Sequence, residues 1–239
     1  IDKEIIKIRR ELKRLVGNIS EEELNALLSK AQRDKSYEEL LSLLELAESE
    51  SEQTDIIQRI DAQAYGARIT RAEAVKNKIL AEFTKAAAQE RSLCRELFAS
   101  VFGESYYTNI LNLAEGYDCG IEFDLLPRRA INAALNEPWS SKSFSDRIWQ
   151  HRGVFAEQLE KTIISGLMSG KSNAEMTKEL KDFTDEAYYV KERLIRTETA
   201  HFYGVGQKKA YEAAGIERYR FLAALSDRTC DRCAEVDNK

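Results

Sequence analysis

Proline and glycine are scarce in this chain. Only two prolines and 11 glycines occur in 239 residues, and residues 1–126 contain no proline at all. So few helix-breaking residues, together with abundant Glu, Lys, Ala and Leu, predict a mainly helical protein. With 43% hydrophobic and 32% charged residues, the composition suits a folded chain with a core rather than a disordered one.

Histidine is also scarce, and the usual catalytic patterns are missing. His151 and His201 lie on separate predicted helices. The sequence has no Ser-His-Asp order, no glycine-rich phosphate loop and no His-Glu-x-x-His motif. We therefore predict that the chain is not an enzyme. Glu198 and His201 are i, i+3 neighbours that could share a metal ion, although a surface contact or a structural hydrogen bond is the commoner role of such a pair.

The four cysteines are Cys94, Cys119, Cys230 and Cys233. The sequence shows no signal peptide and no stretch long enough to span a membrane, which predicts folding in a reducing cytoplasm. We expect Cys94 and Cys119 to be ordinary buried thiols. The first residue is Ile1, so we also expect the beginning of the protein to be missing.

The net charge of −5 gives no case for nucleic-acid binding by the whole chain. Residues 20–61 hold twelve acidic and four basic residues, a pattern typical of a solvated helical face. A local alternative is a basic cluster near the C-terminus whose side chains would contact phosphates. Its members are Lys208, Lys209, Arg218, Arg220, Arg228 and Arg232.

Residues 1–126 are predicted to form an extended helical region. Residues 1–16 have helical spacing, and capping boxes at Ser20-x-x-Glu23 and Ser36-x-x-Glu39 predict two short helices. A long helix is expected from about Thr54 to Cys94, a rod of about 60 Å at 1.5 Å per residue. Two shorter helices bent at Gly66 are the alternative.

Residues 127–239 are predicted to form a smaller α+β module. Glycines and both prolines cluster in residues 103–140, which we expect to be irregular and to hold the domain boundary. Helices are predicted over 144–167, from 173, and over 185–214 with a stop at Gly215. Alternating residues predict a strand over 218–225. A DNA-reading helix-turn-helix is disfavoured, because beyond its first residue, Asn173, the helix offers Lys178 and Lys181 but no Arg, Asn or Gln.

The predicted strand leads into Cys230-Asp231-Arg232-Cys233. Two thiolates at this spacing can hold one metal ion in a tight knuckle, but a closed structural zinc site needs four ligands. A redox dithiol would sit at a helix N-terminus beside a parallel sheet, a context not predicted here. A pair of thiols without function is the third interpretation. We favour Cys230 and Cys233 as half of a metal knuckle.

Several short motifs occur together in one order, and they resemble the tailed-phage minor head protein family, also called phage head morphogenesis or Mu F-like proteins. The resemblance covers residues 138–239 and is weaker before them. The motifs are Trp139-Ser140, Ser145 to Trp149, Gly166 to Ser172, Arg196 to His201, Gly215 to Tyr219 and Ser226 to Cys233.

In this family the pattern continues beyond the Cys-x-x-Cys with Asp-Gly-Lys and a His-Pro-x-Cys-Arg-Cys segment. This chain has Asp237-Asn238-Lys239 and then ends, so only Cys230 and Cys233 can be carried over as zinc ligands. We therefore expect the module to be truncated at its C-terminal end and zinc to bind in the full-length protein.

The resemblance implies a structural minor capsid protein acting in head assembly and in DNA packaging or ejection. Its implied partners are the portal protein, the major capsid or scaffolding protein and packaged DNA, with no membrane. Its implied place is the virion head interior, and the host cytoplasm during assembly. Some relatives carry a toxin-like enzyme after the shared domain, and none is evident in these residues. The alternatives are a nucleic-acid-binding zinc-knuckle module and, ranked last, a metal-dependent enzyme.

Overall fold

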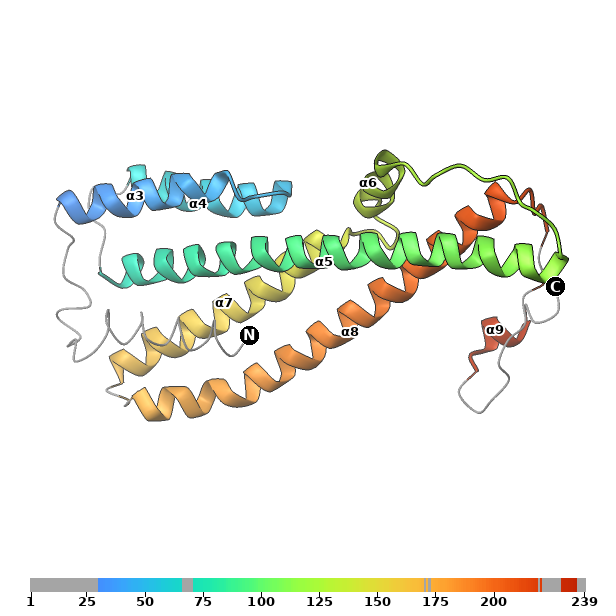
Figure 1. Cartoon of the computed structure of the whole chain (residues 1–239). Helices are drawn as coiled ribbons and strands as arrows, with labels where there is room; N and C mark the ends of the chain where they lie inside the picture. Colours follow the sequence, from blue (N-terminus) through green and yellow to red (C-terminus); the bar gives the residue numbers. More distant parts are fainter. Residues whose placement is uncertain are drawn as a thin grey trace. The chain divides into compact units, whose positions relative to one another are not determined.

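Helices make up most of the residues that the structure describes. The computed structural model describes residues 30–65, 71–169, 171, 173–218, 220 and 229–235, and these ranges contain helices but no strand (Figure 1). The prediction of a mainly α fold is confirmed. The helices are α3 (Lys30–Leu44), α4 (Glu50–Tyr65), α5 (Arg71–Tyr117), α6 (Arg128–Asn136), α7 (Phe144–Met168), α8 (Asn173–Ala213) and α9 (Asp231–Glu235).

The described residues do not support the α+β character predicted for the C-terminal module. Arg218 and Arg220 lie in neither a helix nor a strand, and the rest of the predicted strand over 218–225 lies outside the described residues. The helices predicted for residues 1–16 and from Ser20 also lie outside them. None of the described helices is both long and apolar enough to cross a membrane.

The contacts divide the chain into two compact units. The first takes its described residues from 1–97 and 135–198, and the second from 98–134 and 199–239. Helices α5 and α8 each contribute to both units. The predicted boundary between 1–126 and 127–239 stays a prediction, because each of these packing units combines segments from both parts of the sequence.

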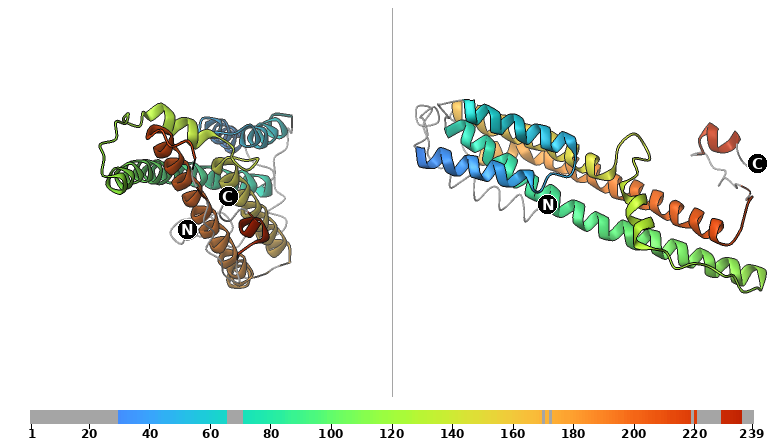
Figure 2. Two further views of the ribbon diagram at one scale, coloured as in Figure 1. Left: turned by 90° about the vertical axis from the view of Figure 1, so that its right-hand side faces the viewer. Right: turned by 90° about the horizontal axis from the view of Figure 1, so that it is seen from above.

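In the part of the first unit that the structure describes, the helices bury apolar side chains in two clusters. Figure 2 shows α3, α4 and α7 grouped around the first part of α5. One cluster joins α3, α4 and α5, and consists of Leu40, Leu43, Ile56, Ile60 and Ala81. The other joins α5 to α7, and consists of Ile79, Phe83, Leu159 and Ile163. Full burial of each large apolar side chain stabilises the fold by about 1.5–3 kcal/mol.

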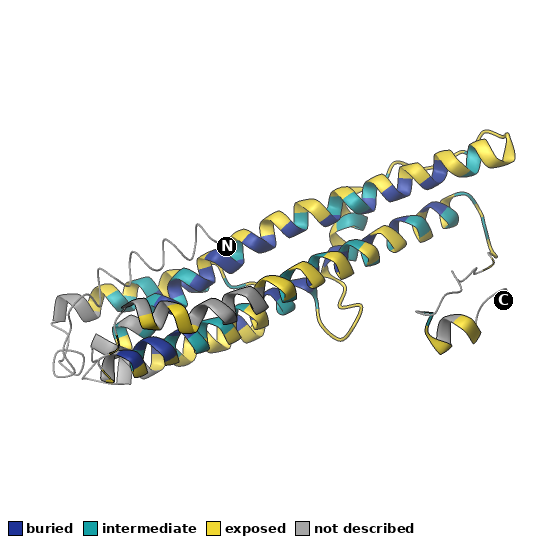
Figure 3. Cartoon of the chain, turned by 90° about the horizontal axis from the view of Figure 1, so that it is seen from below, coloured by how far each residue is buried: buried dark blue, intermediate teal, exposed yellow. Residues whose placement is uncertain are grey.

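In the second unit, the later turns of α5 pack closely on the later turns of α8. Phe98 and Phe202 stack with their ring centroids 5.1 Å apart. Ser105 Oγ donates to the Tyr203 carbonyl oxygen at 2.6 Å. A Cβ added at Gly206 would lie 2.5 Å from the Phe102 carbonyl oxygen, so only glycine permits this approach of the two helices. Figure 3 shows the buried positions recurring along one side of each helix.

Helix α8 ends as predicted. Gly215 has a positive φ of 71°, which glycine adopts without the steric cost of a Cβ. The Ile216 N–H donates to the Tyr211 carbonyl at 2.9 Å, and the Gly215 N–H donates to the Glu212 carbonyl at 3.2 Å. These two bonds form a Schellman motif that satisfies the last carbonyls of the helix.

Several other element predictions need correction. The helix expected from Thr54 to Cys94 is not one continuous rod, because Ile56 and Ile60 of α4 pack against Ala81 of α5. The alternative bend at Gly66 lies outside the described residues. Ser36-x-x-Glu39 lies inside α3 and does not start a helix. Much of 103–140 is regular, because α5 continues to Tyr117 through Gly103 and Gly116. The two helices expected after residue 172 are one helix, α8, whereas the helix predicted over 144–167 is confirmed as α7.

The close approach at Gly206 gives a stability prediction. Gly206→Ala is expected to lower the free energy of unfolding by about 1–3 kcal/mol, because backbone must move to relieve the overlap. Gly204→Ala is the matched control on the same helix. No atom lies within 4 Å of its added Cβ, so it should raise stability by up to about 1 kcal/mol. Urea unfolding followed by circular dichroism measures both, and equal effects would contradict the packing described.

Candidate functional site

The Cys-x-x-Cys pair lies at the start of a short helix. Cys230 is exposed and directly precedes α9, and Cys233 lies within that helix. A helix N-terminus also fits the redox interpretation, but the described ranges contain no sheet beside it. Among the described residues no group of three or more His, Cys, Asp or Glu side chains could hold a metal ion. Two cysteines alone do not make a closed zinc site, so zinc binding stays a prediction.

Four of the six basic residues proposed as phosphate contacts lie on α8 or in the segment that follows it. Lys208 and Lys209 are exposed on α8, but both lie beside Glu212, with Nζ–Oε distances of 3.9 and 2.6 Å. The hydrogen bond from Lys209 holds the pKa of Glu212 below its usual value. Arg218 and Arg220 are exposed in the segment after α8.

The remaining two basic residues, Arg228 and Arg232, add no evidence for a shared phosphate-binding surface. Arg228 lies outside the described residues, and Arg232 lies in α9. The nucleic-acid interface therefore also stays a prediction.

Three of the quoted motifs converge on Glu198. This glutamate is completely buried on α8. Its Oε1 accepts a short hydrogen bond from Arg147 of α7, and its Oε2 accepts one from Trp139 Nε1 at 2.9 Å. The Arg147 guanidinium also lies 5.0 Å from the centre of the Trp139 ring, a cation–π contact. The motifs around residues 139, 147 and 198 thus form one anchoring cluster within the first unit.

This cluster does not favour a metal at Glu198. Both of its carboxylate oxygens are engaged by Arg147 and Trp139, which leaves it poorly suited to ligate metal together with His201. His201 itself lies edge-on to the Phe202 ring, with centroids 5.0 Å apart. Arg196, at the start of the same motif, is exposed and pairs with Glu192 at 2.8 Å.

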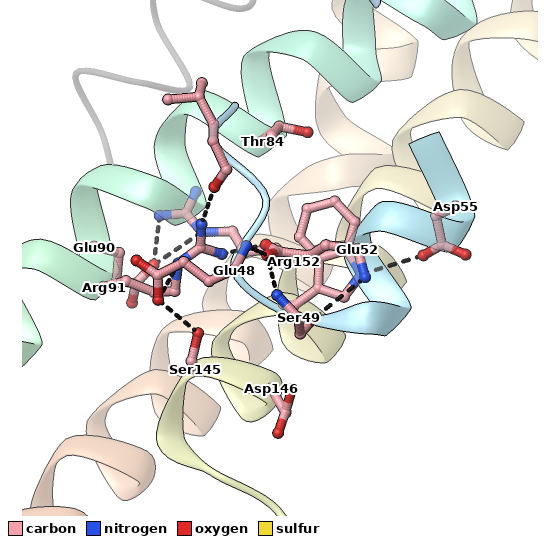
Figure 4. A network of polar contacts seen from close by, with 12 residues as sticks. Glu48, Ser49, Glu52, Asp55, Thr84, Glu90, Arg91, Ser145, Asp146 and Arg152 are labelled. Atoms are coloured by element: carbon pink, nitrogen blue, oxygen red, sulfur yellow. Dashed lines mark hydrogen bonds and ion pairs between the residues drawn. The ribbon is translucent and has the colours of Figure 1, made fainter. Parts of the chain in front are cut away.

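A second buried charge cluster lies between α4 and α5. Arg91 and Glu52 are both completely buried and form a direct ion pair (Figure 4). Arg91 Nη2 donates to the Leu46 carbonyl oxygen at 2.7 Å. Arg91 Nε lies 3.4 Å from Glu48 Oε2, an ion-pair contact whose geometry makes no hydrogen bond. The guanidinium is therefore neutralised by a carboxylate from another helix.

Glu52 has a second role as the start of α4. Its Oε2 accepts hydrogen bonds from the Glu48 and Ser49 N–H groups at 2.7 and 3.3 Å. In return Ser49 Oγ accepts from the Glu52 N–H at 3.2 Å. This reciprocal pair of hydrogen bonds is a capping box. The Glu52 side chain therefore caps α4 and also forms the buried ion pair with Arg91. A similar box formed by Ser143 and Asp146 starts α7.

A third charge cluster joins α5, α7 and α8. The Glu90 carboxylate receives Arg152 Nε at 2.8 Å and Lys191 Nζ at 3.0 Å. Burial by itself would raise the pKa of Glu90, but the positive charges of Arg152 and Lys191 outweigh it and hold that pKa below 4.5. Burial, reinforced by Glu90, raises the pKa of the neighbouring Cys94 to about 11. Cys94 is therefore a buried, protonated thiol, as predicted, whereas Cys119 is exposed and that prediction was wrong.

A cavity of the first unit is lined by several charged side chains that are already paired. A cavity of about 490 Å³ lies among α4, α5 and α7. Two of its basic side chains, Arg59 and Lys76, share Glu160 at 3.3 and 2.7 Å. Its Asp55 accepts from Trp149 Nε1 at 3.1 Å. These contacts favour a structural role for the charges in this unit.

The sequence carries a signal for the buried charges in the spacing of the apolar residues. On α5 the spacing Ile79, Phe83, Ala87 continues by one turn to Arg91. On α4 the spacing of Ile56 and Ile60 extends back by one turn to Glu52. A charged residue on an apolar stripe faces the core, and only a partner of opposite charge makes that tolerable.

The Arg91–Glu52 pair gives the second prediction. Arg91→Met is expected to lower the free energy of unfolding by about 3–5 kcal/mol, because it leaves the Glu52 carboxylate buried without its counter-charge. Arg95→Met is the matched control, because Arg95 is partly exposed and lies 3.5 Å from Glu48, so its loss should cost about 1 kcal/mol or less. Chemical unfolding measures both, and similar losses would contradict the importance of the buried pair.

The Glu90 cluster gives a prediction on pH. Because the folded pKa of Glu90 is lowered, the stability it contributes is present above its unfolded pKa of 4.5 and is lost as the pH falls through the folded pKa. The free energy of unfolding should therefore fall more steeply below pH 4.5 in the wild type than in Glu90→Gln. Parallel slopes for the two proteins in this acid range would refute the assignment.

Comparisons with known proteins agree with the motif pattern. Residues 157–239 match the family described as Phage Mu protein F like protein. The chain is also 29% identical over 140 residues to a protein of Enterococcus faecalis (strain ATCC 700802 / V583) named NAD(+)--arginine ADP-ribosyltransferase EFV. That alignment covers 57% of this chain and 29% of the relative, so the chain spans well under half the length of this curated protein.

No solved structure matches the chain significantly. The family match includes the Arg196 to His201 motif and the Cys-x-x-Cys pair, while Trp139 and Arg147, which contact Glu198, precede it. The match over residues 157–239 confirms the resemblance of this chain to the phage head morphogenesis, Mu F-like family.

Proposed function

We propose that this chain is a structural minor capsid protein of a tailed phage. In this role it acts in head assembly and in DNA packaging or ejection, through contacts with the portal protein and with the major capsid or scaffolding protein. The observation that carries the proposal is the Mu F-like family match over residues 157–239. Its places of action are the virion head interior and, during assembly, the host cytoplasm.

A non-enzymatic role is part of the proposal. In the described residues the buried carboxylates of Glu52, Glu90 and Glu198 are each bound by arginine, and such pairs hold helices together rather than react. The name of the Enterococcus protein attributes arginine ADP-ribosylation to that protein. Release of nicotinamide from NAD⁺ by the purified chain would contradict a purely structural role.

A second candidate is nucleic-acid binding through a zinc knuckle. The observation that favours it is the exposure of Lys208, Lys209, Arg218 and Arg220 within one unit. Zinc would be held by Cys230 and Cys233 together with ligands from elsewhere, and it would tie the knuckle closed. This function makes the phage DNA itself a partner.

The portal contact is tested by co-expression. The chain is expected to co-purify with the tagged portal protein of its own phage and not with the portal protein of an unrelated phage, which serves as the control. Failure to recover any complex with portal, capsid or scaffolding protein, in vitro or in virions, would overturn the proposal. Binding to duplex DNA that weakens steeply with salt and is lost in Lys208→Glu/Lys209→Glu would instead support the second candidate.

A further inference from the structure

One stretch of the second unit carries negative charge only. Residues 98–127 contain Glu104, Glu115, Asp118, Glu122 and Asp124 but no lysine, arginine or histidine. The next basic residues are Arg128 and Arg129 at the start of α6. The stretch comprises the last part of α5 and the segment that connects it to α6.

The connecting segment is fixed against α5 by two tyrosines. Tyr106, buried on α5, donates its hydroxyl to the Asp124 carbonyl at 2.8 Å. The Tyr107 hydroxyl accepts from the Leu126 N–H at 3.1 Å. The Phe123 ring meets the Tyr107 ring edge-on, with centroids 6.3 Å apart. The segment therefore presents a defined surface together with the helix.

Large apolar side chains remain exposed on this surface. Leu125 is 79% exposed and Leu111 is 57% exposed, and Phe123 and Tyr107 are 43% and 40% exposed. Tyr107 and Leu111 lie one turn apart on the same face of α5, and Tyr107 touches Phe123. Leu125 lies two residues after Phe123 on the same segment. Large apolar side chains exposed together on one segment and the helix that holds it are typical of an interaction site rather than of scattered surface residues.

Acidic residues border these apolar side chains. Glu104 and Glu115 lie one turn before Tyr107 and one turn after Leu111 on α5, and both are exposed. On the connecting segment, Glu122 and Asp124 flank Phe123 and are also exposed. We call the four apolar residues with these four acids the acidic apolar surface. Its apolar centre and negative rim complement a partner with apolar side chains flanked by lysine or arginine.

We propose that the acidic apolar surface binds a basic amphipathic helix of a partner protein. The apolar face of that helix would cover Leu111, Phe123 and Leu125, and its lysines or arginines would face the acidic rim. The site lies outside the residues that match the Mu F-like family, so it does not depend on the proposed head-assembly function. The proposal therefore adds binding of a basic amphipathic helix, which the match to the Mu F-like family does not imply.

The test uses two synthetic amphipathic peptides of about 18 residues, which is five helical turns. One is built from leucine and lysine and the other, with the same apolar pattern, from leucine and glutamate. Fluorescence anisotropy with the whole chain should show binding of the leucine–lysine peptide only. The binding should weaken between about 50 and 500 mM salt, because the charges become screened.

Variants connect the binding to this surface. Leu111→Ser/Leu125→Ser and Glu115→Lys/Glu122→Lys should each weaken binding by about tenfold or more. The matched controls change exposed residues of the first unit, Tyr188→Ser/Tyr189→Ser for apolar area and Asp34→Lys/Glu45→Lys for charge. They should bind like the wild type. Circular dichroism should show an unchanged helix content in all four variants, because the altered side chains are exposed.

Three outcomes would overturn the proposal. The two peptides could bind equally, or the binding could survive both changes to the surface. Alternatively, sedimentation equilibrium could show that the wild type self-associates and that Leu111→Ser/Leu125→Ser is monomeric. In that case the occupant would be a second copy of this chain. Failure of the portal complex with intact peptide binding would reject the proposed function but leave this surface in place.

Discussion

The packing of the first unit depends on the ion pair between Arg91 and Glu52. Both groups are completely buried, so water does not solvate them. Glu52 depends on Arg91 for neutralisation, and Arg91 has Glu52 as its buried counter-charge beside the exposed Glu48. Removing two charges from water costs several kcal/mol per ion, and the direct pairing offsets that cost only in one relative position of α4 and α5. The pair therefore fixes position more than it adds stability.

The same device recurs at two other places on the helices of this unit. Glu90 binds Arg152 and Lys191, and Glu198 binds Arg147 and Trp139. Together these contacts connect α5, α7, α8 and the segment before α7. Such contacts keep long helices in register, because a sliding helix would separate charges as well as apolar side chains.

Much of the fold follows from the sequence, but the buried charges do not. Scarce proline predicted the helices, Gly215 predicted the end of α8, and the apolar spacing of Ile148 and Leu159 predicted α7. Gly103 and Gly116 predicted an irregular segment, but they lie within α5, because glycine costs only about 1 kcal/mol within a helix and packing along α5 overrides so small a preference. The order of motifs identified Trp139, Arg147 and Glu198, but their meeting depends on the path of the chain between them, which no local pattern encodes.

Glu52 both caps α4 and pairs with Arg91, and these two roles limit which substitutions position 52 can tolerate. A glutamine at position 52 would keep the capping hydrogen bonds but leave Arg91 without its counter-charge, and an aspartate would be one methylene too short for both tasks. A change at position 91 alone would likewise leave the buried Glu52 carboxylate without a counter-charge. Substitution at either position is therefore acceptable only with compensation at the other, so the two positions, 39 residues apart in sequence, should vary as a pair among homologues.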